Sequence, residues 1–164
     1  MTDCWVAPEY LFNGQEVVCG QAVRIVDGRI TEIAKTLDSA VRIKGCLTPG
    51  FVDLQVNGGG GVMLNTTPTR SGMADIAAAH RTFGTVAVMP TVITDHWAVL
   101  EQAADAAIAA KGDDGIIGLH IEGPHISVAR RGTHNASHIR PMDDRTLNVV
   151  AGLRRHDIAV MITV

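Results

Sequence analysis

The sequence predicts an α/β protein in which a small β unit precedes a parallel sheet covered by helices. Two observations predict this fold. Short β-like runs separated by turn residues fill positions 1–49, and from residue 50 onward apolar runs alternate with helical segments. Strands that are buried on both faces and alternate with helices are typical of a parallel sheet. We therefore expect a small β-sandwich-like domain at 1–49 and an α/β domain at 50–164.

The first domain is expected to contain a β-hairpin. The runs AVRIV (22–26) and RITEIA (29–34) flank the dipeptide Asp27-Gly28. Both central residues of a type I′ turn need a positive φ, and Asp-Gly supplies them readily. This pair therefore predicts two antiparallel strands joined by a two-residue turn.

The second domain is expected to contain four strands and three helices. The expected strands are 50–56, 85–93, 115–123 and 158–164. The expected helices are 73–84, 95–112 with Asp95 as N-cap, and 142–156. The glycines of VNGGGG (56–61) match no phosphate-binding motif, so we interpret them as residues that allow positive φ or close backbone approach after the first strand.

The length of the second domain leaves two architectures open. A (β/α)₈ barrel takes about 250 residues, so 50–164 forms either a small open sheet or the first four or so βα units of such a barrel. The run 158–164 is uninterruptedly apolar, and a sheet that stops there leaves an edge unpaired. We therefore expect a truncated barrel, and a fragment rather than a complete domain.

Composition restricts the class of partner and the compartment. The chain has 164 residues, of which 46% are apolar and 19% charged, with a net charge of −3. This balance gives no reason to expect nucleic acid or an anionic membrane as partner, whereas a small-molecule substrate is compatible with it. No signal peptide or membrane span is indicated, so a cytoplasmic location is expected. Cys4, Cys19 and Cys46 are expected to be buried or half-buried free thiols.

Glu122 is the first candidate functional residue. It ends an apolar strand and precedes Gly123-Pro124, at the strand end where α/β proteins place their ligands. A carboxylate in that position must be paired, protonated or bound to a cation. A metal ion is one explanation, and satisfaction by loop amides or by an arginine such as Arg130 is the alternative.

The seven histidines of the chain differ in what their positions indicate. His120 is interpreted as a packed core residue, and His125 has no assigned role. His134, in the loop RRGTHN, could reach back over the strand end as an electrophile or substrate contact, or it could be exposed to solvent. The remaining four have no partner at ligand spacing and are interpreted as ordinary surface or interface residues: His80, His96, His138 and His156.

Three stretches together resemble a known family. LTPGFVDLQVNGGGGVMLN (47–65), MPTVIT (89–94) and GLHIEGPHISVARRGTHN (118–135) resemble the N-terminal portion of N-acetylglucosamine-6-phosphate deacetylases, which belong to the amidohydrolase superfamily. The resemblance extends over essentially the whole chain. It implies a metal-dependent hydrolase with a (β/α)₈ barrel, which acts on the acetamide of N-acetyl-D-glucosamine 6-phosphate and dimerises at full length.

The resemblance also implies roles for individual residues. Glu122 matches a ligand of one catalytic divalent metal, zinc or iron, and His134 matches the histidine that polarises the substrate carbonyl. Thr133 belongs to the same substrate-binding loop. Gln55 and Asn57 stand where related enzymes carry two histidines for a second metal, so a single occupied site is expected.

The family's other metal ligands are implied to follow Val164, so we expect the chain alone to bind metal weakly and to lack turnover. Two alternatives stay open at this point. One is a non-catalytic α/β module or assembly partner that pairs its last strand with another polypeptide. The other is a different amidohydrolase, such as a dihydroorotase-like hydrolase.

Overall fold

The computed structural model describes residues 2–164, and the chain divides into two compact units, Met1–Pro49 and Gly50–Val164. The first unit is one five-stranded sheet, with strands β1 (Asp3–Phe12), β2 (Val17–Val18), β3 (Gln21–Val26), β4 (Arg29–Lys35) and β5 (Val41–Leu47). β1 pairs antiparallel with β2 and β3 and parallel with β5, and β4 pairs with β3. Asp27 and Gly28 have φ of 49° and 76°, which confirms the predicted hairpin.

The three cysteines lie in this first unit, and all of them are exposed. The expectation of buried or half-buried thiols was therefore wrong. The buried cluster of the unit is small, consisting of Ala7, Ala22 and Ala40 with Trp5 packed against them. A single sheet with so little buried volume leaves many of its side chains in contact with solvent.

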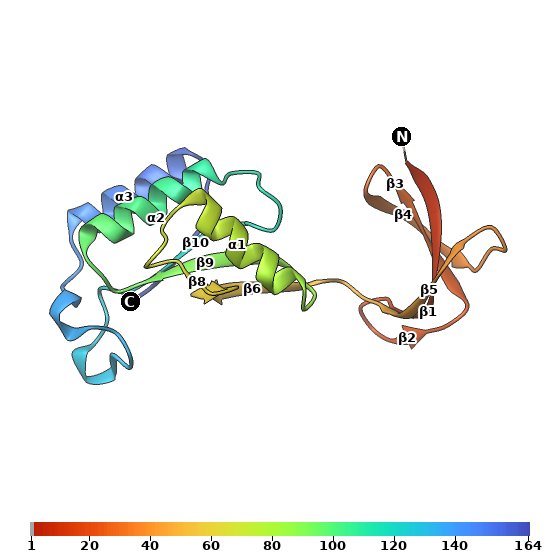
Figure 1. Ribbon diagram of the computed structural model, residues 1–164, viewed down its shortest axis with the longest axis horizontal. Coiled ribbons are helices and arrows are strands. Elements are labelled where there is room, and N and C mark those ends of the chain that lie inside the picture. Colours follow the sequence, from red (N-terminus) through yellow and green to blue (C-terminus); the bar gives the residue numbers. More distant parts are fainter. Residues whose placement is uncertain (1) are drawn as a thin grey trace. The chain divides into compact units, whose positions relative to one another are not determined.

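The second unit contains a four-stranded parallel sheet covered by helices, which confirms the α/β class. Its elements are β6 (Phe51–Val56), β7 (Gly58–Gly59), β8 (Val62–Met63), α1 (Arg70–Arg81), β9 (Thr85–Ile93), α2 (Trp97–Ala109), β10 (Leu119–Glu122), η1 (Val128–Arg130), η2 (Ala136–His138), α3 (Asp144–Arg155) and β11 (Val160–Thr163). The strand order is β11-β10-β9-β6, and every adjacent pair is parallel. Figure 1 shows α1, α2 and α3 together on one face of this sheet.

The sheet presents two different faces because side chains alternate along each strand. Val88 and Val92 of β9 and Ile121 of β10 belong to the buried cluster that packs against the helices. Their neighbours along the strands, including His120 and Glu122, therefore point to the face that carries no helix. The candidate residues of β10 project from this second face.

The helices begin and end at slightly different residues from those predicted. α1 begins at Arg70, earlier than expected, because Thr69 caps it by accepting a hydrogen bond from the Gly72 N–H at 3.1 Å. α2 has His96 rather than Asp95 at its N-cap, and no side chain caps it. The predicted N-cap role of Asp95 is therefore wrong.

The glycine run after β6 forms a short hairpin between β7 and β8. Gly60 and Gly61 at its turn have φ of 61° and 82°, in agreement with the expectation that this run contains positive φ angles. The hairpin returns the chain to Leu64, whose N–H bonds to the Asn57 carbonyl at 3.0 Å before α1 begins.

Candidate metal and substrate site

The carboxyl ends of β9 and β10 hold the candidate residues close together. β9 ends at Ile93 and continues into Thr94, while β10 ends at Glu122 and continues into Gly123. Because these strands are parallel neighbours with Glu122 opposite Ile93, the residues that follow them meet at one edge of the sheet. Ligands of α/β proteins bind at this edge.

Glu122 offers a half-buried carboxylate. Its side chain is 20% exposed, and Oε1 lies 3.6 Å from Nε2 of His134. Within residues 2–164, no hydrogen bond to this carboxylate is formed, and the alternative partner Arg130 lies exposed in η1. The carboxylate oxygens therefore keep lone pairs available for a cation.

His134 lies in the loop that connects β10 to α3, and it is buried, with 8% exposure. Its Nδ1 forms a 2.8 Å hydrogen bond with Oγ1 of Thr94. Arg131 fixes its main chain twice, since the His134 N–H donates to the Arg131 carbonyl at 3.0 Å and Nη1 of Arg131 donates to the His134 carbonyl at 2.8 Å. The open alternative of a solvent-exposed histidine thus does not describe this residue.

Thr94 joins the two strand ends, and the sequence analysis did not identify it. Its buried Oγ1 bonds to His134 and donates to the Glu122 carbonyl at 3.4 Å. A Cβ at Gly123 would overlap Oγ1 of Thr94, and Gly123 also has φ of 78°. The glycine that follows Glu122 is therefore needed because the backbone passes close to Thr94. A glycine at this point of the sequence is the one signal from which a residue packed against the end of β10 could have been expected.

The other predicted site residues lie at different depths. Thr133 is exposed beside the buried His134. Gln55 is exposed on β6, and Asn57 is half-buried after it. Their positions stay compatible with a substrate loop and a strand end, but within residues 2–164 none of them forms a hydrogen bond or ion pair with the Glu122 side chain.

His120 is a buried core residue, as interpreted from the sequence. Nδ1 lies 3.2 Å from Oγ1 of Thr91 on β9, and Nε2 lies 2.8 Å from Oγ1 of Thr163 on β11. Burial lowers the pKa of His120, and the nearby charge of Glu122 opposes that shift. The neutral imidazole therefore connects three strands beneath the candidate site.

Two of the histidines interpreted as isolated surface residues are in contact. The rings of His96 and His138 have centroids 4.1 Å apart and are tilted by 58°. With the Asp95 carboxylate, they form a group whose ligand atoms lie within 4.8 Å of one another. The interpretation that they lack a partner at ligand spacing was wrong, because the fold joins segments that are distant in sequence.

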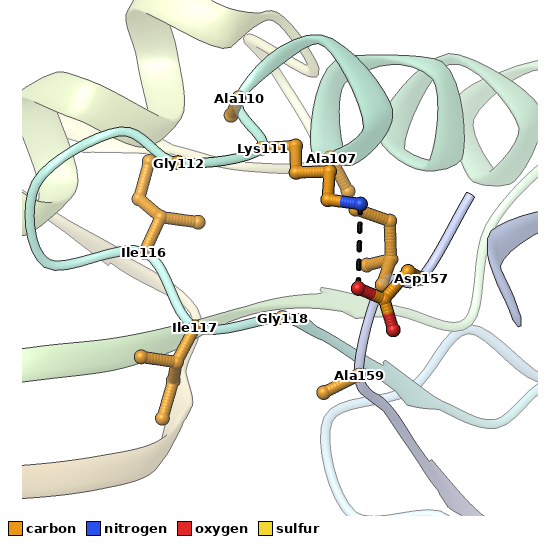
Figure 2. Close-up of a pocket in the computed structure, with 10 residues that line it drawn as sticks. Ala107, Ala110, Lys111, Gly112, Ile116, Ile117, Gly118, Asp157 and Ala159 are labelled. Atoms are coloured by element: carbon orange, nitrogen blue, oxygen red, sulfur yellow. Dashed lines mark hydrogen bonds and ion pairs between the residues drawn. The ribbon is translucent and has the colours of Figure 1, made fainter.

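A pocket of about 170 Å³ lies at the opposite end of the strands, next to Gly118 and Ala159. Figure 2 shows Lys111 and Asp157 pointing toward one another at this pocket, with a Nζ to Oδ2 distance of 3.4 Å. Since these residues precede β10 and β11, the pocket is separate from the edge that holds Glu122 and His134.

The fold and this edge define a class of α/β protein that places a carboxylate and an imidazole at the carboxyl ends of parallel strands. Comparison with known proteins shows which members of this class the chain is similar to. The chain is 44% identical over 134 residues to an N-acetylgalactosamine-6-phosphate deacetylase of Shewanella sp. (strain ANA-3), an alignment that covers 76% of the chain and 34% of that protein. It is 34% identical over 155 residues to the Bos taurus N-acetylglucosamine-6-phosphate deacetylase, covering 84% and 38%.

A solved structure agrees with these relatives. The chain matches an N-acetylglucosamine-6-phosphate deacetylase from Pasteurella multocida with a TM-score of 0.90 at 24% identity, covering 99% of the chain and 45% of that protein. The predicted resemblance to the N-terminal portion of these deacetylases is therefore confirmed. The chain spans little more than a third of the length of the two curated relatives. No protein-family model matches it. Among the helices of residues 2–164, none is long and apolar enough to cross a membrane.

Proposed function

We propose that the chain forms part of a metal-dependent hydrolase that cleaves the acetamide of N-acetyl-D-glucosamine 6-phosphate to D-glucosamine 6-phosphate and acetate. The observation that carries this proposal is the pairing of Glu122 with buried His134 at 3.6 Å, in a chain similar to deacetylases. The relatives are enzymes named for this class of reaction. A dihydroorotase-like hydrolase receives no comparable support.

Glu122 is proposed to hold one divalent metal, zinc or iron. The residue fits this role, since its half-buried carboxylate accepts no hydrogen bond within residues 2–164 and carboxylate oxygens bind both metals. Such a metal, when bound, lowers the pKa of a bound water and polarises a carbonyl.

His134 is proposed to donate a hydrogen bond to the acetamide carbonyl of the substrate. This role requires the single Thr94 hydroxyl proton to turn from the Glu122 carbonyl at 3.4 Å to Nδ1 of His134 at 2.8 Å, which leaves the proton of a neutral ring on Nε2, on the side of Glu122. The exposed Thr133 beside it is available to contact the sugar. Burial of His134 and its bond to Thr94 hold the orientation of the ring before substrate arrives.

The described residues do not complete this site. A catalytic zinc needs about three protein ligands and an open position, and Glu122 is the one that we assign. We infer that the sheet is the first part of a (β/α)₈ barrel, whose later strands supply the missing ligands. The sequential parallel order and the helices on one face support this inference. The 164 residues alone are therefore expected to lack turnover.

One observation favours a second sugar. The relative from Shewanella is 44% identical over 134 residues and is named for N-acetylgalactosamine 6-phosphate, the epimer at C4. N-acetyl-D-galactosamine 6-phosphate is therefore the alternative substrate. The acetamide and the phosphate are shared, so the proposed roles of Glu122 and His134 are the same for both sugars.

The assembly module stays the alternative outside catalysis. In this alternative the last strand, β11, pairs with another polypeptide, and β11 is an edge of the parallel sheet. β6 is the other edge and carries exposed Phe51, Val52 and Leu54. An apolar edge strand favours pairing with further polypeptide. This alternative would be supported if the protein encoded by the reading frame formed a stable oligomer and released no acetate.

The test uses the reading frame that encodes these residues, expressed to its natural stop codon. Acetate release is measured from both sugar phosphates after loading with zinc or iron. We expect Glu122→Gln and His134→Ala each to reduce kcat/KM by about 10²-fold or more, whereas His156→Ala, on an exposed residue at the end of α3, leaves it unchanged. Acetate release that is unaffected by Glu122→Gln would contradict the proposal.

A further inference from the structure

Asp95, His96 and His138 bring three ligand groups together at the loop edge of the sheet. Asp95 and His96 follow β9, while His138 ends η2 in the long loop before α3. One ligand atom from each residue lies within 4.8 Å of the others. A carboxylate and two imidazoles are a frequent ligand set for divalent transition metals.

Neighbouring groups hold the Asp95 carboxylate in place. Oδ2 accepts a hydrogen bond from Nδ2 of Asn65 at 2.9 Å, and Oδ1 accepts one from the His96 N–H at 2.7 Å. Each oxygen keeps a second lone pair for a ligand. Second-shell hydrogen bonds of this kind orient the carboxylates of metal sites.

Arg140 connects the two segments that carry the ligands. Its Nη1 donates to the Asp95 carbonyl at 3.2 Å and to the His138 carbonyl at 2.9 Å. The guanidinium also lies over the Trp97 ring, 4.0 Å from its centroid. This residue fixes the backbone on both sides of the cluster, so ligand groups from distant parts of the sequence start near their bound positions.

We propose that Asp95, His96 and His138 form a binding site for one divalent transition metal such as zinc or cobalt. Two nitrogens and one oxygen favour these metals over calcium or magnesium, which take oxygen ligands. Two ligand atoms on one tetrahedral zinc lie about 3.4 Å apart, so rotations of the exposed His96 and half-buried His138 side chains bring the ligand atoms together from within 4.8 Å. The bound ion connects the segment between β9 and α2 to η2.

This site is distinct from the one assigned to Glu122 and does not depend on the proposed reaction. Glu122 and His134 are joined through Thr94, whereas the three ligands here are joined through Asn65 and Arg140. Thr94 and Asp95 are adjacent in sequence, so an ion at the second site steadies the segment that anchors His134. The binding itself can be measured without substrate.

The test is zinc binding by the 164-residue chain, measured by equilibrium dialysis and by competition with a chromogenic chelator. The expectation of weak metal binding by the chain alone concerns the incomplete site at Glu122, whereas all three ligands of this second site lie within the chain. The unchanged chain, Glu122→Gln and His156→Ala are therefore expected to retain one zinc at this site. Asp95→Asn, His96→Gln and His138→Gln are expected to weaken it by about tenfold or more. Cobalt absorption reports loss of an imidazole ligand independently, and circular dichroism verifies that each variant is folded.

Three results would overturn the proposal. The unchanged chain could bind no zinc, or the two histidine variants could bind zinc as tightly as the unchanged chain. Alternatively, Glu122→Gln and His138→Gln could lose the same single ion, which would mean one shared site. None of these results depends on whether the chain, or the protein that contains it, hydrolyses a sugar phosphate.

Discussion

Thr94 and His134 lie 40 positions apart in the sequence, and their side chains share a buried hydrogen bond of 2.8 Å between Oγ1 and Nδ1. This bond places Nε2 of His134 beside Glu122. The side chain of this loop histidine is thereby oriented by the residue that follows β9, whereas its sequence neighbour Arg131 holds its main chain.

Thr94→Val removes this bond while keeping the side-chain shape. Burying Nδ1 of His134 without a partner is expected to lower the free energy of unfolding by about 1–3 kcal/mol. Urea denaturation measures the change. Thr82→Val, on an exposed threonine whose Oγ1 donates to the Ala79 carbonyl, is the control and should stay within about 0.5 kcal/mol. If both variants lost the same free energy of unfolding, the buried bond would contribute no more to stability than the exposed one.

Gly123→Ala tests the close approach of β10 to Thr94. The new Cβ overlaps Oγ1 of Thr94, and φ is 78°. Gly132→Ala is the matched control, because Gly132 has φ of 57° with no neighbour within 4 Å. The control carries only the strain of left-handed backbone, about 1–2 kcal/mol. Thermal unfolding should show a larger loss for Gly123→Ala, and a loss no larger than that of Gly132→Ala would refute the packing argument.

Asp143 links the stability of α3 to pH. It caps the helix by accepting from the Thr146 N–H at 3.0 Å, and this bond holds the pKa of the Asp143 carboxyl below 3.8. A lowered pKa gives stability that is present above the unfolded value and is lost as pH falls through the folded value. Asp143→Asn keeps a capping side chain but cannot titrate, so its stability should fall less as the pH is lowered. Asp143→Ala also loses the cap, so it should be less stable than the unchanged chain at neutral pH as well. Thermal unfolding from pH 7 to about pH 2 measures both, and identical pH profiles for all three proteins would contradict the assignment.

Leu153 tests how strongly α3 packs on the parallel sheet. It is fully buried in the cluster between helices and sheet, whereas Leu147 on the same helix is 55% exposed. Leu153→Ala is expected to reduce the free energy of unfolding by about 2–5 kcal/mol, and Leu147→Ala by less than about 0.5 kcal/mol. Comparable effects of the two changes, in denaturant unfolding, would mean that α3 is not held by this contact.

The elements that could be predicted from sequence are those with local signals. The strand Thr85–Ile93 is a mostly apolar run, and the structure places a strand over those residues. The turn at Asp27-Gly28 was predicted for the same reason, since positive φ is a property of the dipeptide. Helix ends were less accurate, because a cap such as Thr69 depends on which backbone N–H its side chain meets.

The candidate site was predictable only in part. Glu122 stands out because a carboxylate rarely ends an apolar strand, but the burial of His134 depends on Thr94, a residue with no chemical signal of its own. The contact of His96 with His138 was missed for the same physical reason. Tertiary contacts between loops leave no periodic pattern in the sequence.

At the end of β9, the Asn65 side chain makes the hydrogen bonds that an adjacent strand would otherwise make. Its side-chain amide accepts from the Ile93 N–H at 3.0 Å and donates to the Ile93 carbonyl at 3.1 Å, as a peptide unit of an adjacent strand would. The last peptide of β9 is thus satisfied independently of how β7 and β8 are built. The hairpin between Asn57 and Leu64 is therefore held by its packing on α1, where the Gly58 carbonyl lies 3.0 Å from Nε2 of His80, and not by a role in completing β9.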